Sequence, residues 1–116
     1  MYTVLIVGFG SIGKRHLKNI LDNFDAKIIL CTKRTDLKKY ERNGIVVVNS
    51  LSEALLHKPD IAFVTNETSY HVSTALKLAK KGVNIFLEKP ISNSMQNVKK
   101  LEKIIHDKKL ITQIGC

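Results

Sequence analysis

The 116-residue sequence has few cysteines, few aromatic residues and no long apolar run. It contains two cysteines, two prolines and no tryptophan, and aromatic residues make up 6% of it. Cys31 and Cys116 lack the spacing of a metal site, so we expect free thiols in a reducing compartment. No apolar stretch approaches the roughly 20 residues of a membrane-spanning helix. No signal-peptide pattern follows Met1, so we expect a cytoplasmic protein with no metal and no membrane partner.

Acidic residues are also scarce. The sequence has 10 of them against 19 lysines and arginines, which gives a formal net charge of +9. Such an excess can indicate a polyanionic partner. Many of the lysines, however, stand between apolar residues at helical spacing, as on a solvated helix face, and no segment interleaves aromatic and basic residues. We therefore expect no nucleic-acid partner, and a basic nucleic-acid-binding domain stays as an alternative.

Short apolar runs alternate with amphipathic stretches along the chain. The runs are rich in β-branched residues and do not alternate with polar ones, which is typical of strands buried on both faces of a parallel sheet. These predicted strands are residues 4–7, 28–31, 45–48, 61–64, 83–87 and 110–114. Strands that alternate with helices predict an α/β fold. We expect a Rossmann-type, doubly wound parallel sheet of about six strands with helices on both faces, in one domain over residues 1–116.

The helices are predicted from apolar residues at helical spacing. Ser50 and Glu53 fit a capping box that would begin a further helix. The three predicted apolar faces are Leu17, Ile20 and Leu21; Val72, Ala75, Leu76 and Ala79; and Val98, Leu101, Ile104 and Ile105.

Glycine is concentrated in one place, directly after the first predicted strand. Gly8, Gly10 and Gly13 form the pattern G-x-G-x-x-G between that strand and the first predicted helix, the context of a dinucleotide site. The first glycine permits a tight turn, the second lets a pyrophosphate lie against the backbone, and the third lets helix and strand pack closely. Free N–H groups at the helix start then face the phosphates. The predicted phosphate-binding residues are Gly8, Phe9, Gly10, Ser11, Ile12 and Gly13.

The end of the second predicted strand lacks the acid that NAD sites usually carry. That acid stands about 20 residues beyond the glycines and binds the ribose 2′-hydroxyl. Here Thr32, Lys33 and Arg34 occupy the region. A hydroxyl and two cations would attract a 2′-phosphate that an acid would repel. We predict NADP over NAD, and two readings stay open: Lys33 and Arg34 as surface cations, or Asp36 as the ribose ligand.

Two further polar segments follow the fourth and fifth predicted strands, at the edge where open α/β sheets bind ligands. Together with the glycine segment they resemble the Gfo/Idh/MocA oxidoreductases, the glucose-fructose oxidoreductase and inositol dehydrogenase family. The resemblance extends over essentially the whole chain. It rests on residues 8–13 with His16, on Thr65, Asn66 and His71, and on Glu88, Lys89 and Pro90.

The resemblance implies site residues. Thr65 and Asn66 would line the nicotinamide ribose, His71 would lie near the cofactor, and Glu88 would contact the nicotinamide end. Lys89 matches the family's catalytic lysine, which binds the substrate hydroxyl or carbonyl and assists proton transfer. On the residues alone, Lys89 reads as a solvated lysine at a strand end, and His71 equally well as a helix-start residue with a local backbone bond.

The resemblance also implies an activity: hydride transfer to or from a secondary alcohol or ketone of a sugar, cyclitol or sugar nucleotide. The family's enzymes carry a second, α+β substrate domain, which we expect to be absent here, so that this chain alone would bind coenzyme without turnover. Apolar surface left by its absence would favour a homo-oligomer. Two alternatives remain beside the nucleic-acid one. A non-catalytic nucleotide-binding or redox-sensing module would give Lys89 no role, and a methyltransferase would leave residues 88–90 unexplained.

Overall fold

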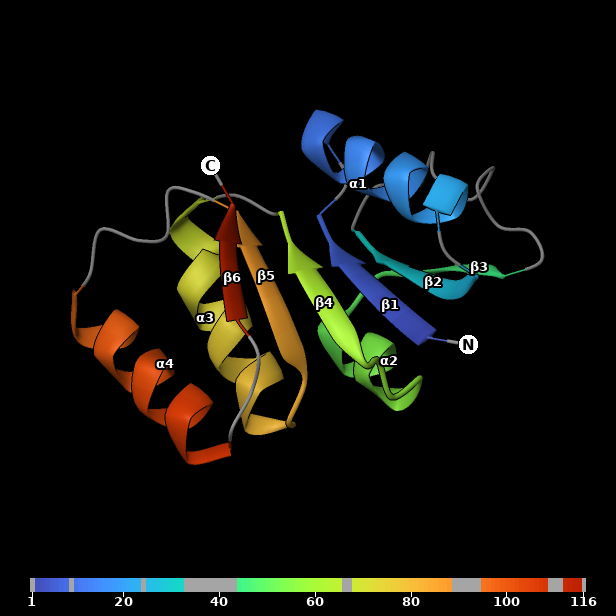
Figure 1. The fold of residues 1–116 in the computed structure, drawn as a ribbon. Helices are drawn as coiled ribbons and strands as arrows, with labels where there is room; N and C mark the ends of the chain where they lie inside the picture. Colours follow the sequence, from blue (N-terminus) through green and yellow to red (C-terminus); the bar gives the residue numbers. More distant parts are fainter. Residues whose placement is uncertain are drawn as a thin grey trace.

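The computed structural model describes residues 2–8, 10–23, 25–32, 44–65, 68–88, 95–108 and 112–115. Strands and helices alternate along them (Figure 1). No described helix is long and apolar enough to cross a membrane. In chain order the elements are β1 (Tyr2–Val7), α1 (Ser11–Asn23), β2 (Ala26–Cys31), β3 (Ile45–Val48), α2 (Leu51–Leu56), β4 (Ile61–Val64), α3 (Thr68–Lys80), β5 (Asn84–Glu88), α4 (Met95–Lys108) and β6 (Thr112–Gly115).

The six strands form one parallel sheet in the order β3-β2-β1-β4-β5-β6. From β1 the chain steps outward to β2 and β3, returns to β4 on the other side of β1, and then steps outward again. The direction therefore reverses between β1 and β4. Val7 pairs with Val64 at the end of this register, so the two strands end level. This order confirms the predicted Rossmann-type doubly wound sheet.

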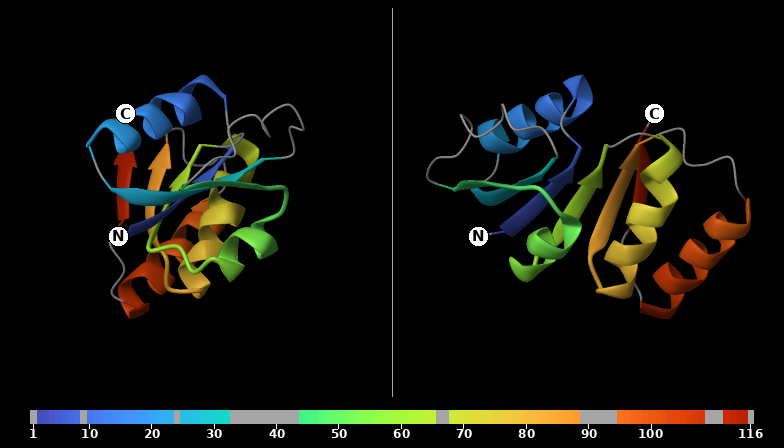
Figure 2. Two further views of the ribbon diagram at one scale, coloured as in Figure 1. Left: turned by 90° about the vertical axis from the view of Figure 1, so that its right-hand side faces the viewer. Right: turned by 180° about the vertical axis from the view of Figure 1, so that it is seen from behind.

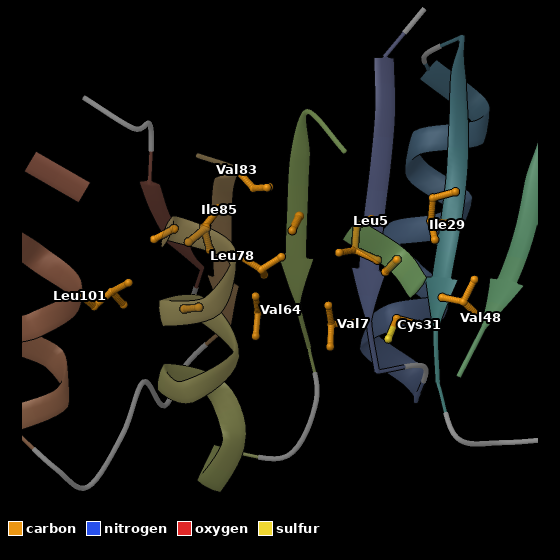
Figure 3. Close-up of a cluster of buried hydrophobic side chains, with 14 residues drawn as sticks. Leu5, Val7, Ile29, Cys31, Val48, Val64, Leu78, Val83, Ile85 and Leu101 are labelled. Carbon is orange, nitrogen blue, oxygen red and sulfur yellow. The ribbon is translucent and has the colours of Figure 1, made fainter. Parts of the chain in front are cut away.

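Apolar side chains fill both faces of the sheet. Leu5 and Ile6 are neighbours on β1, point to opposite faces, and are both 0% exposed. The larger core lies between the sheet and α2, α3 and α4, and includes Leu5 and Leu78 (Figure 3). The smaller core lies under α1 and includes Ile6 and Leu17. Figure 2 shows α1 on one side of the sheet and the other helices opposite. Burial on both sides explains why the strand sequences do not alternate.

One predicted apolar face is wrong in part. Leu17 and Ile20 are buried at 5% and 6%, but Leu21 is 39% exposed. At about 100° per residue, Gly13, Leu17 and Ile20 lie within about 60° of one another on the helix. Leu21 lies about 70° from the middle of that stripe, so it falls at the rim of the contact with the sheet. On α3 the opposite occurs, because Leu78, outside the predicted face, is 0% exposed.

Candidate functional site

The carboxyl ends of β1 and β4 meet at the point where the strand order reverses, which is where open α/β sheets bind ligands. Gly8 follows β1 there. Its φ of 83° lies in the left-handed region, which only glycine adopts without strain. Its amide donates to the carbonyl of Cys31 at 2.9 Å. The chain is thus still bonded to β2 at the residue where it turns away toward α1.

Thr65, the residue after β4, contacts the turn after β1. Its backbone amide donates to the carbonyl of Val7 at 2.9 Å. Its hydroxyl lies 3.0 Å from the Val7 carbonyl oxygen and 2.9 Å from the Gly8 carbonyl oxygen. One side chain therefore ties the end of β4 to the turn after β1.

Gly10 begins the helix that follows. Its carbonyl accepts from the amide of Lys14 at 3.0 Å, the first bond of α1. The N–H groups of the first turn therefore have no acceptor within the helix and are directed back toward the turn. Gly13, one turn on, is buried. A glycine at that position lets α1 approach the sheet closely.

Neither the backbone angle nor the packing of the described residues requires glycine at position 10. Its φ lies outside the left-handed region, and no described atom stands within 4 Å of the place a Cβ would occupy. Gly10 is also exposed. The open space beside it is available to a group that is not part of the chain, such as a pyrophosphate lying against the main chain.

The end of β2 lies beside this turn. Thr32 is 9% exposed, and its amide donates to the carbonyl of Val48 at 2.9 Å. Burial, with a smaller contribution from Glu53, raises the pKa of the Cys31 thiol from 9.0 to about 11. The raised pKa keeps this thiol protonated at neutral pH, and a protonated thiol is a weak nucleophile. In the part of the chain that the structure describes, no group of three or more His, Cys, Asp or Glu could hold a metal ion.

The structure thus brings Gly8, Gly10, Gly13, Thr32 and Thr65 to one edge of the sheet. Of the other predicted site residues, it describes four by backbone alone: Ser11 and Ile12 in the first turn of α1, His71 in the first turn of α3, and Glu88 at the end of β5. Five lie outside the described residues: Phe9, Lys33, Arg34, Asn66 and Lys89. The roles given to these nine residues stay predictions.

An aromatic cluster beside the turn was missed from the sequence. The ring of His16 lies 4.9 Å from that of Phe63 and 5.2 Å from that of Phe86, and the two phenylalanines are 5.2 Å apart. Phe63 and Phe86 pair across the β4–β5 register. The cluster holds α1 against strands beyond the switch point. Each phenylalanine is the third residue of its strand, which is the signal that could have placed them together.

The comparisons with known proteins agree with this geometry. The family described as the oxidoreductase family with an NAD-binding Rossmann fold (Gfo/Idh/MocA) matches residues 2–116. The chain is 29% identical over 115 residues to the uncharacterized oxidoreductase YrbE of Bacillus subtilis, and 25% identical over 116 residues to scyllo-inositol 2-dehydrogenase (NAD(+)) of the same organism. Each alignment covers 95% of this chain and 34% of the relative.

A solved structure shares the fold. The myo-inositol 2-dehydrogenase of Lactobacillus plantarum superposes with a TM-score of 0.86 at 20% identity, over 98% of this chain and 36% of that one. The chain therefore spans about a third of the length of the proteins it matches. Since the family match extends over nearly every residue, the chain belongs to the Gfo/Idh/MocA oxidoreductase family, as an NAD-binding Rossmann domain.

Proposed function

We propose that this chain binds a nicotinamide dinucleotide at the turn after β1, as the coenzyme domain of a dehydrogenase. Gly10 is the observation that supports the proposal most directly. It is a glycine beside open space, at the start of a helix and at the switch point of the sheet. Neither its backbone angle nor the packing of the described residues calls for glycine, whereas a pyrophosphate against the backbone does.

The residues around the turn suit a diphosphate. The first N–H groups of α1 are unpaired within the helix and carry the positive end of its dipole. The backbone of Ser11 and Ile12 would hold the phosphates, together with the turn of Gly8 and Gly10. The Thr65 amide donates to the carbonyl of Val7, and its single hydroxyl hydrogen lies within reach of the carbonyls of Val7 and Gly8, which weakens the acceptors that would oppose an anion. When bound, the nicotinamide supplies or accepts the hydride.

The proposed substrate is a secondary alcohol or ketone of a polyol, sugar or sugar nucleotide. The names of two matched proteins support the class, because both are inositol dehydrogenases. Lys89, the residue after β5, is the proposed catalytic group: it would bind the reacting oxygen and exchange a proton with it as the hydride moves. Asn66 would line the nicotinamide ribose, His71 in the first turn of α3 would lie near the cofactor, and Glu88 at the end of β5 would contact the nicotinamide end.

We also propose that the coenzyme is NADP in preference to NAD. No acid stands at residues 32–34, where an NAD site usually has one. The hydroxyl of Thr32 and the cations of Lys33 and Arg34 would receive a 2′-phosphate. One matched protein has NAD(+) in its name, so the preference is a property that must be measured on this chain.

Calorimetric titration with NADPH and with NADH tests both the coenzyme site and the preference for NADP. A charge-assisted hydrogen bond is worth roughly 1.5–3 kcal/mol. Arg34→Ala should therefore weaken NADPH binding at least about tenfold and leave NADH binding nearly unchanged. Lys103→Ala, at an exposed position on α4, is the control and should change neither.

Each outcome bears on a separate claim. No heat with either coenzyme would overturn the coenzyme site itself. Equal losses of NADPH and NADH affinity in Arg34→Ala would overturn the preference alone. If Lys89→Ala kept kcat in an active enzyme that contains this domain, the catalytic assignment would be wrong while the coenzyme site stood.

A further inference from the structure

A groove with a volume of about 470 Å³ lies at the amino end of the sheet. The end of α2, the loop before β4 and the segment before β5 line it. Figure 1 shows α2 and the last turn of α3 at this lower end, away from the carboxyl ends of β1 and β4. The coenzyme turn is thus at one end of the strands and the groove at the other.

The lining of the groove is mostly aliphatic. Leu55, Leu56, Pro59 and Val83 contribute to it. Pro59 and Val83 are the buried members of this lining. Leu56, in contrast, is 81% exposed, the highest fraction of any large apolar side chain among the described residues. A leucine held at the end of a helix beside an apolar groove is suited to contact another apolar side chain from outside.

The rim of the groove is positively charged. Lys58 and Lys81 line it, both are exposed, and its described lining includes no carboxylate. The Lys108 side chain donates to the carbonyl of Lys80 at 2.9 Å, so a third ammonium group lies at the end of α3, one residue before Lys81. An apolar base with a cationic rim recognises apolar side chains that are flanked by carboxylates.

We propose that this groove docks an acidic, amphipathic segment of a partner protein. Leucine-type side chains of the segment would fill the groove between Leu56 and Val83, and its carboxylates would pair with Lys58 and Lys81. A second copy of this chain fits poorly, because each copy carries a formal charge of +9. Two copies would bring like charges together at this rim. The partner is therefore acidic.

The docking surface is independent of the coenzyme site. Its residues precede β4 and β5, whereas Gly8, Gly10 and Thr65 follow β1 and β4. A partner seated in the groove leaves the carboxyl end of the sheet uncovered. Binding of the segment should therefore be the same with and without saturating NADPH or NADH, and it should survive a failure of the coenzyme proposal.

The test uses the 116-residue chain and two synthetic fluorescein-labelled peptides. One is an amphipathic peptide of leucine and glutamate, and its twin has lysine in place of each glutamate. Fluorescence anisotropy measures their binding to the chain. Lys81→Glu should weaken binding of the acidic peptide at least about tenfold, and Leu56→Ser about fivefold. Both side chains are exposed, so neither change should unfold the chain, and circular dichroism checks this.

Matched controls lie elsewhere on the surface. Leu21→Ser removes a leucine that is 39% exposed on α1, and Lys103→Glu reverses an exposed charge on α4. Both should leave the affinity within about twofold of the unaltered chain. Amide chemical shifts should change at residues 52–59 and 81–83.

Three outcomes would overturn the proposal. The first is failure of the acidic peptide to bind at about 1 mM, where even a weak complex of about 4 kcal/mol is half formed. The lysine twin could bind as well as the acidic peptide, which would remove the role of the rim. Finally, the controls could weaken binding as much as Lys81→Glu and Leu56→Ser do, or the shifts could lie outside the groove.

Discussion

The two ends of the sheet use glycine for different reasons. At the amino end, Gly82 follows α3 with a φ of 77°, and its amide donates to the carbonyl of Ala79 at 2.9 Å. The left-handed angle accounts for the residue, since any side chain would be strained there. At the carboxyl end, Gly10 has no such angle, and in the described structure both glycines have open space where a Cβ would stand.

The fold requires glycine at position 82, whereas the described structure would accommodate a side chain at position 10. Gly82 follows the end of helix α3, so replacing it should change the free energy of unfolding. Among the described residues nothing in angle or packing requires glycine at position 10, so replacing Gly10 should act mainly on what binds at the turn. The same substitution at the two positions should therefore have opposite consequences.

The largest expected effect is on coenzyme affinity. Gly10→Ala should weaken NADPH and NADH binding at least about 100-fold, equal to about 2.7 kcal/mol, because the methyl group would occupy the place of the pyrophosphate. Its free energy of unfolding should change by no more than about 1 kcal/mol, the usual range at a helix start. Calorimetry and urea unfolding measure the two quantities.

Gly82→Ala is the matched control at the other end. It should lower the free energy of unfolding by about 1–2 kcal/mol, the cost of the left-handed angle for a residue with a Cβ. Coenzyme affinity should stay the same. If Gly10→Ala instead destabilised the chain as much as Gly82→Ala and kept its coenzyme affinity, the distinction between the two ends would fail.

Titration of the Cys31 thiol tests whether water reaches the core just below the carboxyl end of the sheet. Its pKa in the folded chain is raised from 9.0 to about 11, first by burial and then by Glu53. The unfolded chain therefore releases this proton at lower pH than the folded chain does. Stability is retained below about pH 9 and falls as the pH rises to about 11, by up to about 3 kcal/mol from this thiol.

Urea unfolding across that pH range measures the loss. Cys31→Ala should remove this part of the decline, and what remains comes from the other titrating groups. Cys116→Ala takes away the other thiol of the chain and should keep the decline. A decline that is identical in all three proteins would show that the Cys31 thiol reaches water in the folded chain.

The fold followed from local patterns in the sequence. Leu5 and Ile6 illustrate why: adjacent apolar residues in a short run predict a strand with both faces covered, and both side chains are buried. The turn after β1 was located from the glycine spacing and its place between the first predicted strand and the first predicted helix. The capped start of α2 was predicted from Ser50 and Glu53, and the Ser50 hydroxyl accepts from the Glu53 amide at 3.2 Å.

What the sequence did not reveal depends on the order of the strands. His16 meets Phe63 and Phe86 only because β4 and β5 lie beside β1, which no local pattern states. The groove is another example, since its lining comes from two chain segments far apart in sequence. The exposure of Leu21 depends on the edge of the contact between helix and sheet, which periodicity alone does not define.

The smallest expected effect belongs to the amino end. Lys58 follows the last turn of α2 with a φ of 52°, and its amide donates to the carbonyl of Leu55 at 3.0 Å. Helices often place glycine at such a position, because a side chain there costs about 1 kcal/mol. Lys58→Gly should therefore raise the free energy of unfolding by about 1 kcal/mol and the Tm by several degrees.

Lys58→Ala separates the backbone from the charge. Alanine keeps the Cβ and its strain, so it should give no gain in Tm, while it removes the ammonium group as glycine does. Both variants should bind the acidic peptide more weakly than the unaltered chain. A lysine that costs stability where glycine would not is expected at a position kept for binding. If glycine raised the Tm and left peptide affinity unchanged, Lys58 would be strained without serving the groove.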